Sequence, residues 1–262
     1  MTSSARVWLP VARRLVPDVV SGRERLVALV TGGAHRVGRA IAVGLASDGY
    51  HLALHYHSSG DKARETAALI EGAGGSVTLL AADLARPEAP RALVREAVAR
   101  CGRLDVVVNS AAVMQRMPVG EITAAGWDAV FDLNLRAPML IAQEAAHHLP
   151  EGGSIINIAD LAAFETWPKY LPHGASKAGL VYLTRALARV LAPRIRVNAV
   201  APGTVLLPDG FDPAFAAGLT ASTPLGRDGT PEDVVEAIRY LLRAQYVTGQ
   251  TIVVDGGRNV RG

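Results

Sequence analysis

The stretch LVALVTGGAHRVGRAIAVGLASDG, residues 26–49, decides the fold of this chain. Its first five residues are apolar and predict a short buried strand, and the glycines that follow predict a tight turn. Ile41 and Leu45, spaced among alanines, then predict a helix that ends at Gly49. Backbone N–H groups at the start of such a helix attract phosphate. The spacing, however, is not the G-x-G-x-x-G of the common dinucleotide fingerprint, so this turn alone is weak evidence.

The same alternation of strand and helix continues along the chain. Further strands are expected at residues 51–56, 77–81, 104–108, 155–158, 195–200 and 251–254. Helices are expected at residues 62–71, 87–101 and 127–148, around Lys177, and from Pro231 with Thr230 as N-cap. The proline-containing stretch 205–223 is expected to be mostly loop. This order predicts an α/β fold, a single doubly wound Rossmann-type domain with a parallel seven-stranded sheet and helices on both faces.

We expect residues 25–262 to form this one domain and residues 1–24, which lie outside the pattern, to form a flexible extension. Half of the 262 residues are apolar, which is enough for a sizeable core. A net charge of +3 with scattered basic residues argues against nucleic-acid binding, and no apolar run is long enough for a membrane span. One cysteine and histidines without ligand spacing argue against a disulfide or a metal site. The chain is therefore expected to be cytoplasmic and to act on a small molecule.

Unusual polar residues fall at the carboxyl ends of the predicted strands, where open α/β sheets bind their ligands. One such stretch is SIINIADLAAFETWPKYLPHGASKAGL, residues 154–180. His173 and Lys177 are four residues apart, so they lie on one face of a helix, and Asp160 follows the preceding strand. An acid, a possible proton donor and a cation at one edge predict a proton-transfer site.

Five motifs in order resemble the short-chain dehydrogenase/reductase family over residues 25–258. They are T-G-x-x-x-x-x-G after the first strand, N-S-A-A after the fourth, S-K-A-G on the helix with Lys177, V-A-P-G after the sixth strand, and V-T-G-Q-T-I-V-V-D-G-G near the end. The resemblance implies a nicotinamide dinucleotide cofactor. The cofactor-binding residues that it implies are Gly32, His35, Arg36, Val37, Gly38, His57, Ser58, Asp83, Leu84, Asn109, Ser110, Ala111, Lys177, Pro202, Gly203 and Thr204.

Within that family, TGGAHRVGRAIA and LALHYHSS are similar to the pteridine reductases and dihydromonapterin reductases. Arg36 stands where the family's T-G-x-x-x-G-x-G has its middle glycine. The end of the second strand offers His55, His57 and Ser58 and no carboxylate. A carboxylate there would bind the 2′-hydroxyl of NAD and repel a 2′-phosphate, so the cofactor is expected to be NADP(H).

The catalytic set departs from the family pattern at one position. Counting back from Lys177, the family's tyrosine is His173 and its serine is Asp160. An aspartate in the serine position is similar to the pteridine reductases, whereas a histidine in the tyrosine position is not. The resemblance also implies that Asn134 orders a relay water. An imidazole can donate a proton, but it is shorter than a phenol, so water, Asp160 or Tyr170 are further candidates for the donor.

The implied substrate contacts are Arg36, Met114, Asp160, His173 and Leu206. Leu206, Leu207 and Phe211 are expected to form a lid. The first interpretation is an NADPH-dependent reductase that transfers hydride to a dihydropterin-like substrate. The alternatives are a general ketone reductase and an NADP-binding sensor that lost catalysis with its tyrosine. The resemblance also implies a homo-oligomer, a dimer or tetramer, built on residues 137–148 and 175–191.

Overall fold

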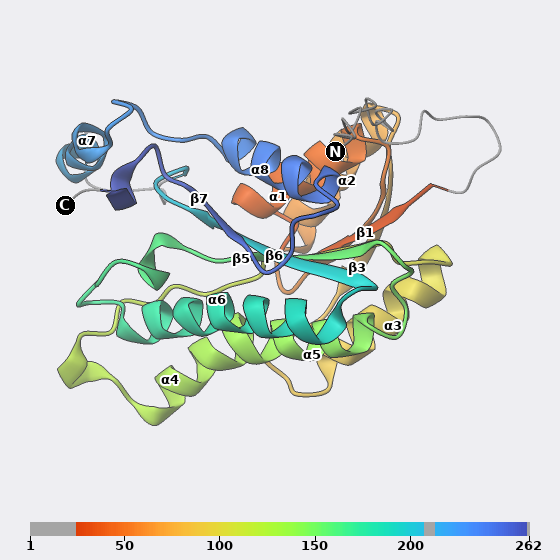
Figure 1. Ribbon diagram of the computed structural model, residues 1–262, viewed down its shortest axis with the longest axis horizontal. Helices are drawn as coiled ribbons and strands as arrows, with labels where there is room; N and C mark the ends of the chain where they lie inside the picture. Colours follow the sequence, from red (N-terminus) through yellow and green to blue (C-terminus); the bar gives the residue numbers. More distant parts are fainter. Residues whose placement is uncertain (1–24, 207–212, 261–262) are drawn as a thin grey trace, which may run out of the picture.

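In the computed structural model, the described residues 25–206 and 213–260 form one layered α/β unit, with backbone alone described for 213–217. The seven strands are all parallel and lie in the order β3-β2-β1-β4-β5-β6-β7 (Figure 1). The predicted Rossmann-type sheet is therefore confirmed. The strands are β1 (Val27–Val30), β2 (His51–Tyr56), β3 (Ser76–Ala81), β4 (Val106–Asn109), β5 (Gly153–Ile158), β6 (Ile195–Pro202) and β7 (Thr251–Val254).

The helices alternate with these strands along the chain. They are α1 (Arg36–Ser47), α2 (Gly60–Gly72), α3 (Ala89–Cys101), α4 (Ala124–Phe131), α5 (Ala137–Ala145), α6 (Leu171–Leu191), α7 (Pro213–Ser222) and α8 (Pro231–Arg243). A π-helical turn, η2 (Asp132–Arg136), joins α4 to α5, and short 3₁₀ turns occur at η1 (Val119–Glu121), η3 (Leu161–Ala163) and η4 (Arg258–Val260). Within these described residues, no helix is both long and apolar enough to cross a bilayer.

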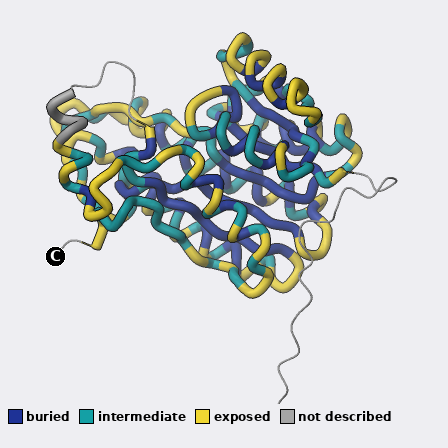
Figure 2. The backbone as a smooth tube through the Cα atoms, turned by 90° about the horizontal axis from the view of Figure 1, so that it is seen from above, coloured by how far each residue is buried: buried dark blue, intermediate teal, exposed yellow. Residues whose placement is uncertain are grey.

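The central strands are mainly apolar because both faces of the sheet are covered. Along β1, Ala28 and Val30 belong to one core, whereas Val27 and Leu29 belong to the other, as the two-residue period of a strand requires. Helices α1, α2 and α8 pack on the first face, and α3, α5 and α6 pack on the second. The tube view shows the buried strands running through the middle of the molecule (Figure 2).

The sheet has its topological switch point between β1 and β4. The chain builds outwards from β1 to β3, then returns to the other side of β1 and builds outwards again to β7. The loops after β1 and β4 therefore leave the sheet in opposite directions and open a crevice at its carboxyl edge. This crevice fixes where a ligand can lie.

The structure differs from the sequence prediction at residues 205–223, which contain helix α7 (Pro213–Ser222) rather than only loop. The prolines suggested a loop, but Pro213 stands at the first position of the helix, where a missing N–H group costs nothing. The alanine-rich residues that follow are good helix formers. The capped start of α8 at Thr230 is confirmed, with Asp233 completing a capping box. Residues 1–24, Leu207 and Phe211 lie outside the described residues.

Arg196 on β6 links the sheet to the last turn of helix α8. Its buried guanidinium donates to the carbonyl of Leu241 at 2.6 Å and to that of Leu242 at 3.0 Å. A cation at the carboxyl end of a helix satisfies carbonyls that have no partner within the helix and opposes the helix dipole.

We expect Arg196→Met to lower the free energy of unfolding by about 2–3 kcal/mol, because buried carbonyls of α8 lose their donor. Urea denaturation of the purified chain measures this loss. Arg243→Met is the matched control, since Arg243 is an exposed arginine of the same helix, and a surface change of this kind costs less than about 0.5 kcal/mol. Equal, small losses in the two variants would contradict the proposed capping.

Candidate active site

The predicted site residues lie together at the carboxyl edge of the sheet, each following a different strand. The glycine turn follows β1, His57 and Ser58 follow β2, and Asp83 and Leu84 follow β3. Asn109 to Ala111 end β4, Asp160 follows β5, and Pro202 to Thr204 end β6. Leu84 differs from its expected role in one respect, because its side chain is 2% exposed and packs in the core. A ligand could therefore meet Leu84 only through its backbone.

The turn after β1 is a tight backbone cradle. Gly32 has φ +66°, and a Cβ atom built on it would lie 2.9 Å from Cα of Ala111. A Cβ atom on Gly38 would lie 2.1 Å from the carbonyl oxygen of Gly32, so neither position accepts a side chain. Helix α1 begins here with His35 as N-cap, whose side chain makes no capping hydrogen bond. The first N–H groups of a helix have no partner within it, and this cradle therefore fits a pyrophosphate.

Arg36 adopts a backbone conformation that normally belongs to glycine. Its φ of 56° makes it the one non-glycine residue with positive φ among residues 25–206 and 213–260. Such a conformation costs about 1–2 kcal/mol for a residue with a Cβ atom. Its guanidinium donates to the carbonyl of Leu206 at 2.7 Å, which links the cradle to the loop after β6. The structure thus brings together two of the predicted substrate contacts, Arg36 and Leu206.

Two side chains underneath the cradle hold it in place. The hydroxyl oxygen of Thr31 accepts from the N–H groups of Ser110 at 2.9 Å and Ala111 at 3.0 Å, which ties the exits of β1 and β4 together. His55 Nδ1 accepts from the N–H group of Gly32 at 3.1 Å. His55 is only 2% exposed. His55 therefore differs from the exposed His57 and Ser58 that follow it, because its ring supports the turn from within the core.

The rim beyond β2 gathers polar and basic side chains. His35, His57 and Ser58 are exposed there. Burial lowers the pKa of His35, and the charges of Lys62 and Arg36 lower it further. Lys62 is therefore close to His35, although the sequence analysis did not include it. The signal was available, because Lys62 lies in the first turn of α2, just after the residues that end β2.

At the other end of the crevice, His173 and Asp160 face each other. Nε2 of His173 lies 3.5 Å from Oδ2 of Asp160, and Nδ1 of His173 lies 3.2 Å from the carbonyl oxygen of Val113. When Nδ1 donates to Val113, Nε2 is the nitrogen directed at the carboxyl group. It is buried and has no hydrogen-bond partner among the described residues. Asp160 is fixed through Oδ1, which accepts from the N–H group of Ala162 at 2.8 Å.

The two groups differ in exposure. The side chain of His173 is 3% exposed, whereas that of Asp160 is 26% exposed. A substrate therefore meets Asp160 more readily, and His173 lies behind it. Both residues are expected from the sequence to contact substrate, and that expectation stays a prediction. The geometry makes Asp160 the more accessible member of the pair.

Asn134 lies in the π-helical turn η2 and is fully used by the protein. Its Oδ1 accepts from the N–H group of Val113 at 2.8 Å, and its Nδ2 donates to the Val113 carbonyl at 2.9 Å and to the hydroxyl of Ser176 at 3.1 Å. π-Helical turns are frequent at functional sites. Asn134 thereby fixes the same carbonyl that His173 approaches. Its expected role in ordering a relay water stays a prediction.

Lys177 is buried one turn further along α6. Its Nζ donates to the carbonyl of Ile158 at 2.7 Å. Burial lowers the pKa of Lys177 to about 8, and the negative charge of Asp160 partly offsets this. Lys177 is thus near its titration point at neutral pH, a property common among residues at functional sites.

Tyr170, the second candidate for the proton donor, precedes α6 and packs its ring edge-on against Trp167, with centroids 6.3 Å apart. The Trp167 ring also stacks on His173, at 6.4 Å. Its Nε1 donates to Glu165 at 2.9 Å. Met114, the expected substrate contact after β4, is 45% exposed. Met114 follows Val113, whose backbone N–H and carbonyl groups are both hydrogen-bonded to Asn134, so Asn134 also holds the backbone next to Met114.

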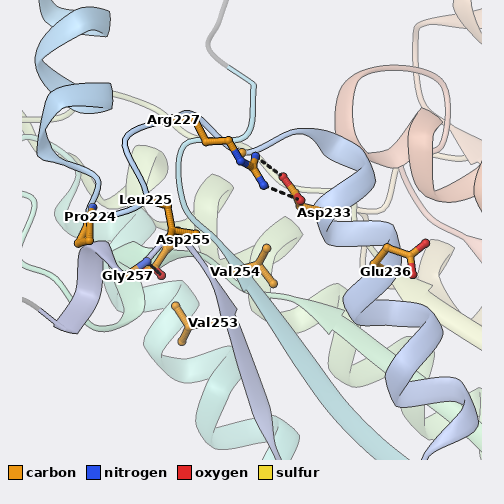
Figure 3. A pocket seen from close by; sticks show the side chains of 11 residues that line it. Pro224, Leu225, Arg227, Asp233, Glu236, Val253, Val254, Asp255 and Gly257 are labelled. Carbon is orange, nitrogen blue, oxygen red and sulfur yellow. Dashed lines mark hydrogen bonds and ion pairs between the residues drawn. The ribbon is translucent and has the colours of Figure 1, made fainter.

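A pocket of about 460 Å³ lies at the outer edge of the sheet, beside β7 and the start of α8 (Figure 3). None of the predicted site residues lines it. Arg227 and Asp233 point toward each other at its wall and form an ion pair at 2.9 Å. Both carboxylate oxygens of Asp255 accept backbone N–H groups. Arg227, Asp233 and Asp255, which line this pocket, therefore already have charged or hydrogen-bonding partners within the chain. In the described ranges, no group of three or more His, Cys, Asp or Glu residues is placed to hold a metal ion.

The crevice and its residues define a nucleotide-binding oxidoreductase, and comparison with known proteins agrees. A family model described as enoyl-(acyl carrier protein) reductase matches residues 32–259. The chain belongs to the short-chain dehydrogenase/reductase family.

Three relatives illustrate the range of that family. An uncharacterized oxidoreductase of Methylorubrum extorquens is 38% identical, over 91% of this chain and 99% of the relative. The 3-oxoacyl-[acyl-carrier-protein] reductase FabG of Staphylococcus aureus is 34% identical, over 88% of this chain and 96% of the relative. The crystal structure of FolM alternative dihydrofolate reductase 1 from Brucella canis, complexed with NADP, is 35% identical, covers 91% of this chain and 96% of its own, and superposes with a TM-score of 0.86.

The burial of Lys177 predicts a dependence of stability on pH. Its pKa in the folded chain is about 8, below the ordinary value of 10.5, so between these values the unfolded chain binds more protons. The penalty on folding is therefore complete below pH 8 and disappears as the pH rises towards 10.5. We expect the apo form of Lys177→Met to be more stable than the parent chain at pH 7, with an advantage that shrinks by pH 9.5.

Urea denaturation at the two pH values measures this difference. Lys169→Met is the control, because Lys169 is an exposed lysine on the loop before the same helix. It should leave the pH dependence of the free energy of unfolding unchanged. A difference between Lys177→Met and the parent chain that is constant with pH would contradict the assignment.

Proposed function

We propose that this short-chain oxidoreductase uses NADP(H) to reduce a dihydropterin-like C=N bond, with Asp160 and His173 supplying the proton. The cofactor assignment is supported by the cradle at Gly32 and by the basic rim with no carboxylate between Tyr56 and Gly60. The observation that carries the proposed chemistry is the 3.5 Å separation between the buried Nε2 of His173 and Oδ2 of the more exposed Asp160. The relative named an alternative dihydrofolate reductase supports the substrate class.

The residues of this chain would divide the work between the two halves of the crevice. The cradle residues Gly32, Val37 and Gly38 would bind the pyrophosphate, and Asp83 and Asn109 to Ala111 would line the nucleoside side. Lys177 would hold the nicotinamide ribose, and Pro202, Gly203 and Thr204 the carboxamide side. Bound NADPH supplies a hydride.

The proton step follows from the geometry of the pair. Nδ1 of His173 lies at the Val113 carbonyl, so Nε2 and Oδ2 of Asp160 face each other and can share one proton. As the substrate carbon accepts hydride, its nitrogen would take that proton through the carboxyl group of Asp160, the more exposed member of the pair. The products would be a C–H bond, an N–H bond, NADP⁺ and the deprotonated His173–Asp160 pair, which solvent then reprotonates. A general acid in this position contributes about 10²–10⁴-fold to the rate.

We expect His173→Phe to lower kcat for dihydropterin reduction by about 10²-fold, because Asp160 loses the partner that holds its proton. The affinity for NADPH should not change. Steady-state NADPH oxidation with dihydrobiopterin, dihydromonapterin and dihydrofolate measures the first quantity, and fluorescence titration measures the second. Unchanged turnover in His173→Phe would remove His173 from the mechanism.

A second candidate function is reduction of a ketone, supported by the relative named 3-oxoacyl-[acyl-carrier-protein] reductase. His173→Tyr separates the two candidates, because it restores a phenol four residues before Lys177. Strong activity of the parent chain on simple ketones or β-keto esters, with none on dihydropterins, would favour the ketone reductase. NADPH binding without turnover on any of these substrates would favour the third alternative, a sensor without catalysis.

The preference for NADPH over NADH yields a separate prediction at the rim. We expect Lys62→Gln to weaken NADPH binding by about tenfold, the effect of losing one charged contact to the 2′-phosphate. The affinity for NADH, which lacks that phosphate, should stay the same. Lys62→Arg keeps the charge and serves as the control. If the two cofactors lost affinity equally, Lys62 would not contact the phosphate.

We also propose that the chain assembles as a homo-oligomer through α5 and α6. Tyr182 and Val190 on α6 are 73% and 75% exposed, and packing of α6 against a second copy would cover them. A cytoplasmic location remains an expectation from the sequence. Light scattering of the purified chain measures the oligomeric state.

A further inference from the structure

His55 is a buried titratable group that the proposed chemistry does not use. It lies next to the carboxyl end of β2, and its ring reaches beneath the crevice between the exits of β1 and β3. Nδ1 of the ring accepts from the N–H group of Gly32 at 3.1 Å, and Nε2 lies 3.0 Å from the carbonyl oxygen of Ala82. The backbone carbonyl of His55 also accepts from the N–H group of Gly33 at 2.9 Å. A single residue thus contacts both segments that border the nucleotide half of the crevice.

These contacts fix the tautomer of the ring. Nδ1 faces an N–H donor and must carry a lone pair, so the proton lies on Nε2 and is donated to the carbonyl of Ala82. The pKa of His55 is lowered to about 4, mainly by burial; the hydrogen bond to the Ala82 carbonyl raises it and the nearby charge of His57 lowers it. The ring therefore stays neutral near pH 7 and keeps both bonds.

The hydrogen bond to Gly32 acts on a peptide whose conformation is already restricted by close contacts. Gly32 is held at φ +66°, close to Ala111, and its carbonyl oxygen touches the position where Gly38 would carry a Cβ atom. The orientation of this peptide sets the direction of the turn that leads into α1. The contact at Ala82 lies next to Asp83, which is predicted to meet the adenine.

We propose that His55 is a positioning residue for the dinucleotide: by donating to Ala82 and accepting from Gly32, it sets the spacing between the pyrophosphate cradle and the adenine side of the crevice. This inference rests on the proposed function, because it presumes that a dinucleotide occupies the crevice. His55 does not touch the reacting atoms, so it acts on cofactor affinity and not on the chemical step.

Two substitutions each retain one of the two hydrogen bonds of the His55 ring. His55→Asn places an amide oxygen where Nδ1 stood and can still accept from Gly32, whereas His55→Gln places its amide where Nε2 stood and can reach only Ala82. We expect His55→Gln to weaken NADPH binding by about tenfold, the effect of one lost hydrogen bond, and His55→Asn by less than about threefold. At saturating NADPH, kcat should stay within about twofold of the parent value in both variants, so the loss appears in the KM for NADPH.

His51→Gln is the matched control. His51 lies on the same strand, at its opposite end, and both ring nitrogens contact hydroxyl groups at 2.9 Å, those of Ser76 and Thr78. It should change thermal stability without changing the dissociation constant for NADPH. Equal effects of His55→Asn and His55→Gln on affinity, or an effect of His51→Gln as large as theirs, would reduce His55 to an ordinary core residue and overturn the proposal.

NMR of the parent chain provides a second test, which does not depend on whether the variants fold. In a ¹H–¹⁵N spectrum of the histidine side chains at pH 7, His55 should appear as the neutral tautomer with hydrogen on Nε2. A proton on Nδ1 would overturn the inference and leave the proposed function intact. If the parent chain binds no NADPH in calorimetry, the proposed function fails, and the inference fails with it.

Discussion

The close approach of the turn after β1 to the loop after β4 is the constraint on which the rest of the structure depends. Gly32 packs against Ala111 with no space for a side chain, and the hydroxyl of Thr31 accepts from two N–H groups of the β4 exit. These contacts lie at the switch point of the sheet. They hold the two diverging loops at a fixed distance, which fixes the glycine turn relative to the loop that leads to Val113 and His173.

The core beneath this edge fixes the register of the strands. Asn109 donates to Asn157 at 2.9 Å, and Asn157 donates to Thr184 on α6 at 2.9 Å, within a mainly apolar core. Burying a polar side chain costs free energy that a hydrogen bond offsets. This chain of three side chains therefore favours one alignment of β4, β5 and α6, which is the alignment that brings Asp160 and Lys177 to the same edge.

Most of the fold followed from the sequence because its patterns are local. Apolar strands such as β1, the capped start of α8 at Thr230 and the glycine turn each depend on a few neighbouring residues. Helix α7 was not predicted from the sequence, because prolines usually interrupt helices, whereas Pro213 is the first residue of this one. In the site, sequence order placed Asp160, His173 and Lys177 together. It could not reveal that His173 lies behind Asp160, that His55 turns inward, or that Lys62 lies near His35, since these depend on contacts between distant segments.

The π-helical turn η2 carries a consequence for how this chain can vary in length. A π-helical turn contains one residue more per hydrogen-bonded ring than an α-helix, and Asn134, which accepts from Val113, lies within this turn. Removing any one residue from 132–136 would rotate everything on one side of the deletion by about 100° relative to the other. The amide would then leave Val113, and the carbonyl that orients the His173 ring would lose its anchor. Insertions and deletions should therefore be excluded from this short segment in active relatives, even though it lies outside the crevice.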